Sequence, residues 1–276
     1  MKNLSNFVLF SVLGILLTAG FAQADMLQQF VGQSGKIDIA GGTAHIPVMT
    51  EAAKRIMTVN PDIRINVEGG GTGVGVQKAG EGLVQIGNTG RALSEDEIAK
   101  YGLVSFAFAV DGVTVVINPG NTVADLSAAQ VQDIFAGKIT NWKDVGGADA
   151  PITLYSRDEA SGTREVFWGK LLNKGDIADS ANIVASNGAM KVAVSQDQGA
   201  IGYMSIGFVD DAVKAPSLDG VEPSQDNAKS GAYKVARKLY MNTKGEPEGL
   251  TKLFVDYVMS PECSDIIAKA GYIPLH

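Results

Sequence analysis

Apolar runs alternate with amphipathic stretches along most of the chain, and this order predicts strands followed by helices. The clearest strand-like runs are residues 36–40, 63–68, 83–87 and 151–156. Each is followed by a loop rich in Gly, Thr or Ser and then by a pattern with helical spacing. One helix is expected to begin at Pro47, because proline suits the first helical position, where a backbone N–H would stay unpaired. Strands that alternate with helices in this way predict an α/β fold with a mostly parallel sheet.

Further patterns mark the ends of elements in the second half of the chain. Ser94-x-x-Glu97 and Ser127-x-x-Gln130 have the spacing of capping boxes, so each is expected to begin a helix. Residues 113–118 and 235–243 are predicted strands, and residues 248–270 are predicted to form two helices interrupted at Ser260-Pro261. The pattern alone is compatible with one large domain or with two lobes.

The first 24 residues predict a secretory signal peptide. Lys2 is followed by the apolar run Phe7–Phe21 and then by Ala22-Gln23-Ala24, which is a small-x-small cleavage site. The alternative is a membrane anchor, but the run is short for a span of about 20 residues. No cysteine lies near the predicted cleavage site, which argues against a lipoprotein anchor. We therefore expect an exported, soluble product.

Composition excludes several classes of function. The chain has 276 residues, of which 45% are hydrophobic and 19% charged, so it is expected to be globular. A single cysteine rules out an internal disulfide framework and a cysteine-rich metal site. The two histidines, His45 and His276, leave little for a histidine-based metal site or for Ser-His-Asp catalysis. A net charge of −7 argues against a nucleic-acid partner, which needs a basic face.

Four glycine- and hydroxyl-rich loops carry the candidate chemistry. They are residues 41–46, 69–73, 88–91 and 157–163. Each precedes a predicted helix, and helix N-termini present unpaired N–H groups and a partial positive charge that together hold anions. A single loop of this kind is usually a tight turn, whereas four, with Arg91 and Arg157 among them, favour a small tetrahedral anion.

Competing motifs fail on spacing. The loop GGGTGVGVQK lacks the Lys-Ser/Thr pair of a nucleotide-hydrolysing P-loop, and its glycines do not fit the dinucleotide pattern. Ser161 lies in ASGT rather than in G-x-S-x-G, and His45 is the one internal histidine that could serve it as a base. Catalytic residues, a metal site and a cofactor are therefore not expected.

Several longer segments resemble the periplasmic phosphate-binding proteins of phosphate ABC transporters. The most specific are IFAGKITNWKDVGG (134–147) and RDEASGTRE (157–165), with VEGGGTGVGV, GAIGYMSIGFV and AGYIPL in the same order as in the family. The resemblance implies a two-lobed, type II-like solute-binding protein, in which each lobe is a mixed, mostly parallel sheet flanked by helices. It places lobe one at about residues 25–115 plus 237–276 and lobe two at about 116–236, with the ligand in the cleft between them.

The same resemblance implies a set of phosphate-binding residues. Thr43 and Ala44 match the first phosphate loop, and Thr72 stands where the family usually has serine. In the second lobe Arg157 would make a charge-assisted contact, with Glu159 orienting it. The alternative for Arg157 is a surface ion pair with a neighbouring acid. The remaining matches to the second-lobe site are Ser161, Gly162 and Thr163.

The third loop, Thr89-Gly90-Arg91, departs from the family pattern, but its arginine and one hydroxyl remain, and all three residues are expected to bind phosphate. Gly90 occupies a position that is Asp in some members, where a carboxylate can accept the proton that phosphate carries and sulfate lacks. We hypothesise that Asp111, just before a predicted crossover strand, supplies this acceptor; alternatively it is a turn residue. For His45, where the family commonly has an apolar residue, a partly buried or exposed loop position is expected rather than a contact to the anion.

The function implied is binding of inorganic phosphate in the periplasm and its delivery to the membrane permease of an ABC importer, by a monomer without catalytic activity. The alternatives are a receptor for sulfate, molybdate or tungstate, a secreted phosphatase that uses Ser161, and an adhesion or signalling protein that reuses the fold.

Overall fold

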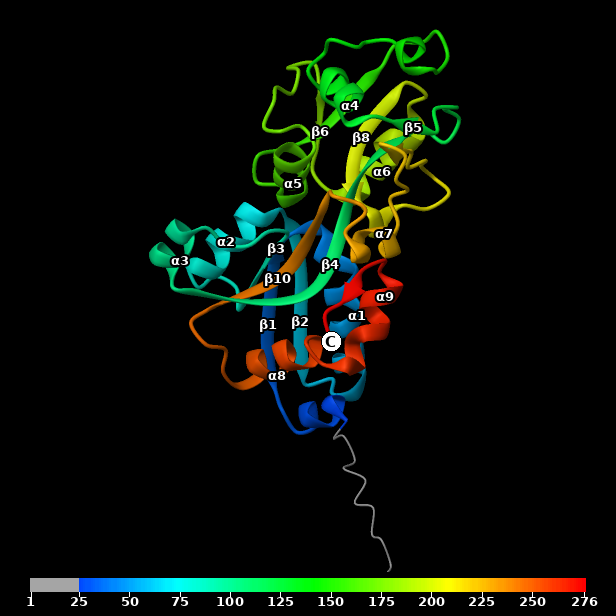
Figure 1. The fold of residues 1–276 in the computed structure, drawn as a ribbon. Coiled ribbons are helices and arrows are strands. Elements are labelled where there is room, and N and C mark those ends of the chain that lie inside the picture. The colour runs from blue at the N-terminus through cyan, green and yellow to red at the C-terminus, as the bar shows by residue number, and fades with distance from the viewer. Residues whose placement is uncertain (1–24) are drawn as a thin grey trace, which may run out of the picture.

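The computed structural model describes residues 25–276, and the predicted signal peptide lies outside these residues. The described chain is a mixed α/β structure whose elements form two groups in space (Figure 1). β1, β2, β3, α1, α8 and α9 lie in one group, and β6, β8, α4, α5 and α6 lie in the other. The α/β fold predicted from the alternating pattern is confirmed.

One curled sheet runs through both groups in the strand order β2-β1-β3-β10-β4-β8-β6-β7, and β11 pairs with β4. β1 pairs in parallel with β2 and β3, and β6 pairs in parallel with β7 and β8. The pairs that involve β10 and β4 are antiparallel. The strands are β1 (Gly35–Gly41), β2 (Ile63–Gly70), β3 (Ile86–Thr89), β4 (Leu103–Ile117), β6 (Thr153–Arg157), β7 (Asn182–Val184), β8 (Ala200–Ser205), β10 (Ala236–Lys244) and β11 (Ile273–Pro274). A separate small sheet consists of β5 (Asp125–Leu126) and β9 (Ser217–Leu218).

Two long strands connect the groups. β4 leaves the first group and enters the second, and β10 returns beside it, so the green and orange ribbons run side by side in Figure 1. β4 pairs with β10 through Leu103–Gly112 and with β8 through Val113–Ile117. The run predicted as a strand at residues 113–118 therefore corresponds to the last third of a longer strand, which ends at Ile117.

Helices flank both parts of the sheet. The α-helices are α1 (Ile46–Val59), α2 (Thr72–Gly80), α3 (Glu95–Tyr101), α4 (Ala128–Phe135), α5 (Gly162–Lys170), α6 (Asn187–Gln196), α7 (Gln225–Ser230), α8 (Gly249–Val258) and α9 (Ser264–Lys269). The short 3₁₀ helices are η1 (Met26–Phe30), η2 (Thr43–His45), η3 (Trp142–Val145), η4 (Ile206–Phe208) and η5 (Pro261–Cys263). No helix among residues 25–276 is both long and apolar enough to cross a membrane.

The predicted helix boundaries are confirmed by their local hydrogen bonds. Ser94 accepts from the backbone of Glu97, whose carboxylate accepts in return from the backbone of Ser94, and Ser127 and Gln130 form the same reciprocal box. Pro47 lies in the first turn of α1. These caps use polar groups that would otherwise stay unpaired at the helix ends.

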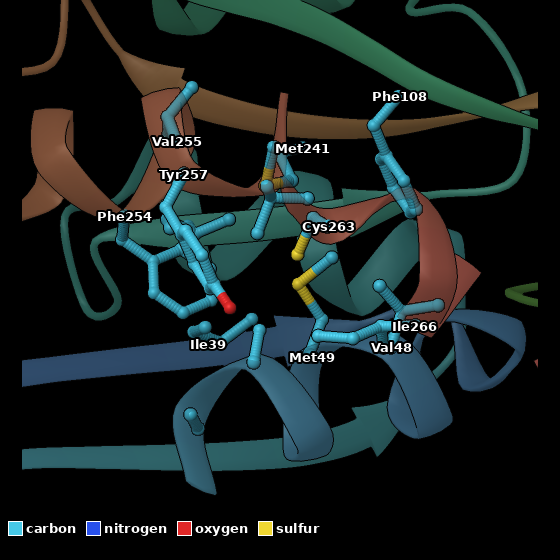
Figure 2. Packing of buried hydrophobic residues seen from close by; sticks show 14 of the residues in the cluster. Ile39, Val48, Met49, Phe108, Met241, Phe254, Val255, Tyr257, Cys263 and Ile266 are labelled. Carbon is cyan, nitrogen blue, oxygen red and sulfur yellow. The ribbon is translucent and has the colours of Figure 1, made fainter. Parts of the chain in front are cut away.

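Buried side chains form separate hydrophobic clusters in the two groups. The largest cluster draws on residues from Phe30 to Ala109 and from Leu239 to Tyr272. Figure 2 shows it where Met49 of α1, Met241 of β10 and Phe254 of α8 meet. A second cluster draws on residues 113–235 and includes Phe135, Phe167 and Tyr203. The boundary between the two clusters lies along β4 and near the start of β10, the two strands that connect the groups.

Candidate anion-binding site

A small cavity lies where the two groups of elements meet. It is lined by Gly42, Thr43, Ala44, His45, Gly71, Thr72, Gly90, Arg157, Ser161, Gly162, Thr163 and Arg237. Eight of the eleven predicted site residues are among them: Thr43, Ala44, Thr72, Gly90, Arg157, Ser161, Gly162 and Thr163. The cavity is therefore lined by residues that are more than one hundred positions apart in the sequence.

The cavity is built from the carboxyl ends of parallel strands and the helix starts that follow them. β1 leads into η2, β2 into α2, and β6 into the loop before α5, so several helix N-termini meet at one place. Unpaired N–H groups and helix dipoles at such a meeting point favour negative charge. Gly71 permits the close approach of α2 to the loop before α5, since its φ is 91° and an added Cβ would lie 2.7 Å from the Ala160 carbonyl oxygen.

Arg157 is the buried cation of this wall. Its side chain enters from the end of β6, and its Nη2 donates to the Ala185 carbonyl oxygen at 3.0 Å. Within residues 25–276 its Nε and Nη1 have no hydrogen-bond partner, although both atoms are buried. Burial lowers the pKa of Arg157 from its usual value. Two unpaired cationic donors in a small cavity are a strong indication of an anionic ligand.

Four hydroxyls line the cavity, and each accepts a hydrogen bond from a neighbouring N–H group. Thr72 Oγ1 accepts from the backbone of Gly90 at 2.9 Å, and Ser161 Oγ accepts from the backbone of Arg164 at 3.2 Å. The other two bonds run from the Asn187 amide to Thr43 at 3.1 Å and from Arg237 to Thr163 at 3.0 Å. The hydroxyls are thus fixed in place, with their own O–H groups free to donate.

A second guanidinium, that of Arg237 on β10, lines the cavity and was not predicted. Asp111 on β4 holds it: Arg237 Nε and Nη2 lie 2.9 and 2.8 Å from Asp111 Oδ2. The sequence contained one signal for Arg237, because it shares the buried face of its strand with Leu239 and Met241. A charged residue at an otherwise apolar, inward-facing position needs a partner or a ligand.

Asp111 contacts Arg237 but does not itself line the cavity. Its other oxygen, Oδ1, accepts from Ser205 Oγ at 2.7 Å, and the residue is fully buried. Burial raises the pKa of Asp111, while Arg237 and Ser205 oppose that shift. Asp111 is not among the residues that line the cavity, and the hypothesis that it is the acceptor for the ligand's proton stays a prediction. The alternative, a turn residue, is wrong, because Asp111 is within a strand.

His45 is also placed differently from the expectation of a partly buried or exposed loop residue. It is completely buried, lines the cavity and packs edge-on against Phe108, with ring centroids 5.6 Å apart. Its Nδ1 lies 3.2 Å from the Gly42 carbonyl oxygen, and within the described chain its Nε2 has no partner. Burial, together with the nearby charge of Arg237, lowers the pKa of His45 to about 3, so the ring is neutral near neutral pH.

Two residues of the third loop lie outside the cavity. Thr89 Oγ1 donates to the Arg91 carbonyl and accepts from Asn242, which fixes the loop. Arg91 makes two hydrogen bonds to Glu97 and a further ion pair with Glu165 of α5. Its charge is thus used in an ion pair between the two groups of elements rather than in the lining of the cavity.

Glu159 was expected to orient Arg157. In the described chain it makes no recorded hydrogen bond or ion pair to Arg157, whose guanidinium donates to the Ala185 carbonyl instead.

The arrangement suits the binding of an anion. Among residues 25–276 there is no group of three or more His, Cys, Asp or Glu side chains that could hold a metal ion. No hydrogen bond is recorded between Ser161 and His45 within that range, so the serine has no base beside it. The cavity offers fixed donors, a feature that stabilises negative charge.

Comparisons with known proteins agree with this geometry. A family model described as a PBP superfamily domain matches residues 31–262. The phosphate-binding protein PstS of Bacillus subtilis strain 168 is 39% identical over 245 residues, covering 88% of this chain and 81% of the relative. A substrate-binding protein from Clostridium perfringens, assigned to a phosphate ABC transporter and solved with bound phosphate, is 36% identical with a TM-score of 0.82, covering 88% of this chain and 100% of that one. An ABC-type phosphate transport receptor from Vibrio cholerae is 33% identical with a TM-score of 0.70, covering 86% and 99%.

Proposed function

Since the chain belongs to the PBP superfamily, and within it to the phosphate-binding proteins of ABC transporters, we propose that it binds inorganic phosphate and delivers it to an ABC importer. One observation carries the proposal for this chain: Arg157 lines a small cavity, and two of its buried nitrogen atoms have no partner in the described residues. A phosphate ion supplies oxygen acceptors in the arrangement that a guanidinium binds best.

In this proposal the ion is held from both sides of the cavity. Arg157 and the start of α5, with Ser161, Gly162 and Thr163, bind it from one side. Thr43, Ala44, Thr72 and Gly90 bind it from the other. Three residues that were predicted to bind phosphate directly would instead support the residues that do. Thr89 fixes its loop, Arg91 forms an ion pair with Glu165, and Asp111 forms an ion pair with Arg237. Helix N-termini and hydroxyls compensate the ion's charge locally, so the net charge of −7 on the whole chain is no obstacle.

We further propose two lobes, residues 25–115 plus 237–276 and residues 116–236, that close on the ligand. The separation of the hydrophobic clusters within β4 and β10 supports this division. Contacts between the lobes support closure around the cavity: the Gly73 N–H donates to the Ala160 carbonyl at 3.0 Å, and Asn187 donates to Thr43 at 3.1 Å. Ligand contacts from both sides would favour the closed arrangement.

The proposed setting is extracytoplasmic, and more specifically the periplasm. The pattern of residues 1–24 supports export. The partners would be inorganic phosphate and the membrane permease of the importer, with the protein acting as a monomer, without catalysis and without a nucleic-acid partner. The reported relatives are named as a binding protein and a transport receptor, which supports a role without turnover.

Calorimetric titration of the phosphate-stripped chain without residues 1–24 tests the proposal. We expect one phosphate to bind per chain, and we expect Arg157→Met to weaken binding at least about a hundredfold, since charged hydrogen bonds contribute about 1.5–3 kcal/mol each. Arg164→Met is the matched control, because Arg164 lies in the first turn of α5, near the cavity, but does not line it. Equal affinities for the two variants, both folded by circular dichroism, would refute the assignment of Arg157.

A further inference from the structure

The hydroxyls that line the cavity are not all held in the same way. Thr72 and Ser161 accept hydrogen bonds from backbone N–H groups of their own lobes, so these bonds do not depend on closure. Thr43 of lobe one differs, because the recorded donors to its hydroxyl both belong to Asn187. Asn187 begins α6, which lies with the second group of elements in Figure 1. The contact between Thr43 and Asn187 therefore exists only where the two lobes meet.

Asn187 uses the whole accepting capacity of the Thr43 hydroxyl. A hydroxyl oxygen has two lone pairs and one hydrogen. Thr43 Oγ1 accepts from the Asn187 side-chain amide at 3.1 Å and from the Asn187 backbone N–H at 3.4 Å. Both lone pairs are thus in use, and only the hydrogen remains. Within the described residues no acceptor is recorded for that hydrogen, and Thr43 lines the cavity.

The Asn187 amide is fixed in the orientation that donates to Thr43. Its Oδ1 accepts from the Ser205 backbone N–H at 3.2 Å. Because a backbone N–H can only donate, the amide oxygen must lie toward Ser205 and the NH₂ group toward Thr43. Asn187 and Ser205 are both fully buried, so bulk water does not compete for these groups. The polarity of the hydrogen bonds therefore runs from Ser205 through Asn187 to Thr43.

The methyl group of Thr43 restrains its hydroxyl as well. A Cβ added at Gly69 would lie 3.2 Å from Thr43 Cγ2, so the methyl group lies close to the end of β2. The methyl group and the hydroxyl share one Cβ, and the χ1 angle of a β-branched side chain has few alternatives. Packing of the methyl group against Gly69 thus keeps Oγ1 on the side of Asn187.

We propose that Asn187 is a positioning residue: when the lobes close, its two donors occupy the lone pairs of Thr43 Oγ1 and make the Thr43 hydroxyl a donor to the bound anion. This inference rests on the proposed function. In an open arrangement, water can donate to that oxygen or accept its hydrogen, so the hydroxyl has no fixed direction. Closure removes the arrangement in which Thr43 would present a lone pair to a negatively charged oxygen, which is a repulsive contact.

The contribution of Asn187 to phosphate affinity should then pass through the Thr43 hydroxyl. A hydroxyl that donates to an anion becomes a better acceptor, so the anion and the Asn187 amide strengthen each other's bond to it. Without the hydroxyl, Asn187 has nothing to direct toward the ligand. A residue that only stabilised α6 would instead affect binding whether or not Thr43 kept its hydroxyl.

A double-mutant cycle measured by calorimetric titration with phosphate tests this dependence. Thr43→Val keeps the shape of the side chain and removes the hydroxyl, and Arg157 and the start of α5 remain to keep binding measurable. In the presence of Thr43, Asn187→Ala is expected to weaken phosphate binding about tenfold, because a hydrogen bond to a charged ligand loses its orientation. In the Thr43→Val background the same substitution is expected to weaken binding by less than about threefold.

A neighbouring substitution serves as the matched control. Ser186 precedes Asn187, and its hydroxyl caps α6 by accepting from the Ala189 backbone at 3.0 Å. Ser186→Ala is expected to lower the free energy of unfolding and to change phosphate affinity by the same factor with and without the Thr43 hydroxyl. Should Asn187→Ala fail to fold, Asn187→Ser takes its place in the cycle, since its side chain suits a helix start but is too short to replace the amide nitrogen.

The outcomes separate this inference from the proposed function. Equal weakening by the Asn187 substitution in the two backgrounds would overturn the inference, because a purely structural role acts in both alike. Unchanged affinity in a folded Asn187 variant that retains Thr43 would overturn it too. Both results leave the proposed function standing, since the wild-type protein binds phosphate in either case. Absence of phosphate binding by the wild-type protein would refute the proposed function itself.

Discussion

Burial of His45 makes the stability of the protein depend on pH. In the folded protein its pKa is lowered from 6.5 to about 3, because the ring is fully enclosed and lies near the charge of Arg237. The unfolded chain therefore binds more protons than the folded one between these two values. Stability contributed by the neutral ring is complete above pH 6.5 and is lost as the pH falls toward 3.

The size of the effect follows from the shift. Each pH unit below the unfolded pKa of 6.5 costs about 1.4 kcal/mol, so acidification from pH 7 to about pH 5 is expected to cost about 2 kcal/mol through His45. Urea denaturation in phosphate-free buffer at the two pH values measures this cost. His45→Asn keeps a side-chain amide that can donate to the Gly42 carbonyl, as Nδ1 does, but it cannot titrate.

The difference between the two proteins is the informative quantity. Asp111 and the surface carboxylates also titrate, but they are present in both proteins and their contributions cancel. The wild-type protein should lose about 2 kcal/mol more than His45→Asn between the two pH values. Equal losses would mean that His45 keeps an ordinary pKa, which would contradict its burial beside Arg237.

Three further substitutions test the close approach of the lobes, the ion pair between them and the packing of the hydrophobic core. Gly71→Ala is expected to weaken phosphate binding at least tenfold by calorimetry, because the added Cβ at φ 91° meets the Ala160 carbonyl oxygen and holds the lobes apart; undiminished affinity would contradict closure at this point. Glu165→Gln removes the ion pair to Arg91 and is expected to weaken phosphate binding only a few-fold, as the Glu165 side chain is half exposed. Phe254→Ala opens a void in the largest hydrophobic cluster and should lower the free energy of unfolding in urea denaturation by about 3–5 kcal/mol. A loss below about 1 kcal/mol would show that this cluster is not tightly packed around Phe254.

The local elements could be predicted from the sequence because their signals are local. Ser94 and Ser127 have their capping partners three residues later, and Pro47 and Ser260-Pro261 mark a helix start and a break. The glycine- and hydroxyl-rich loops identified much of the cavity lining for the same reason, since a helix N-terminus and its hydroxyls are neighbours in the chain.

The residues that were missed or misplaced depend on long-range contacts. Arg237 comes to the cavity only because β10 pairs with β4, which brings it beside Asp111, 126 positions away. Arg91 was expected in the site from its loop, but Glu97 and Glu165 bind its guanidinium first. Which partner binds each arginine is decided by tertiary structure and cannot be predicted from the sequence spacing around Arg91 or Arg237.

A crystal structure of the phosphate-soaked protein tests the central claim most directly. The account predicts one tetrahedral ion in the cavity between the lobes, within hydrogen-bond distance of Arg157 Nε and Nη1 and of the start of α5. An empty cavity at saturating phosphate, or an ion bound elsewhere while the two Arg157 nitrogen atoms stay unpaired, would contradict it.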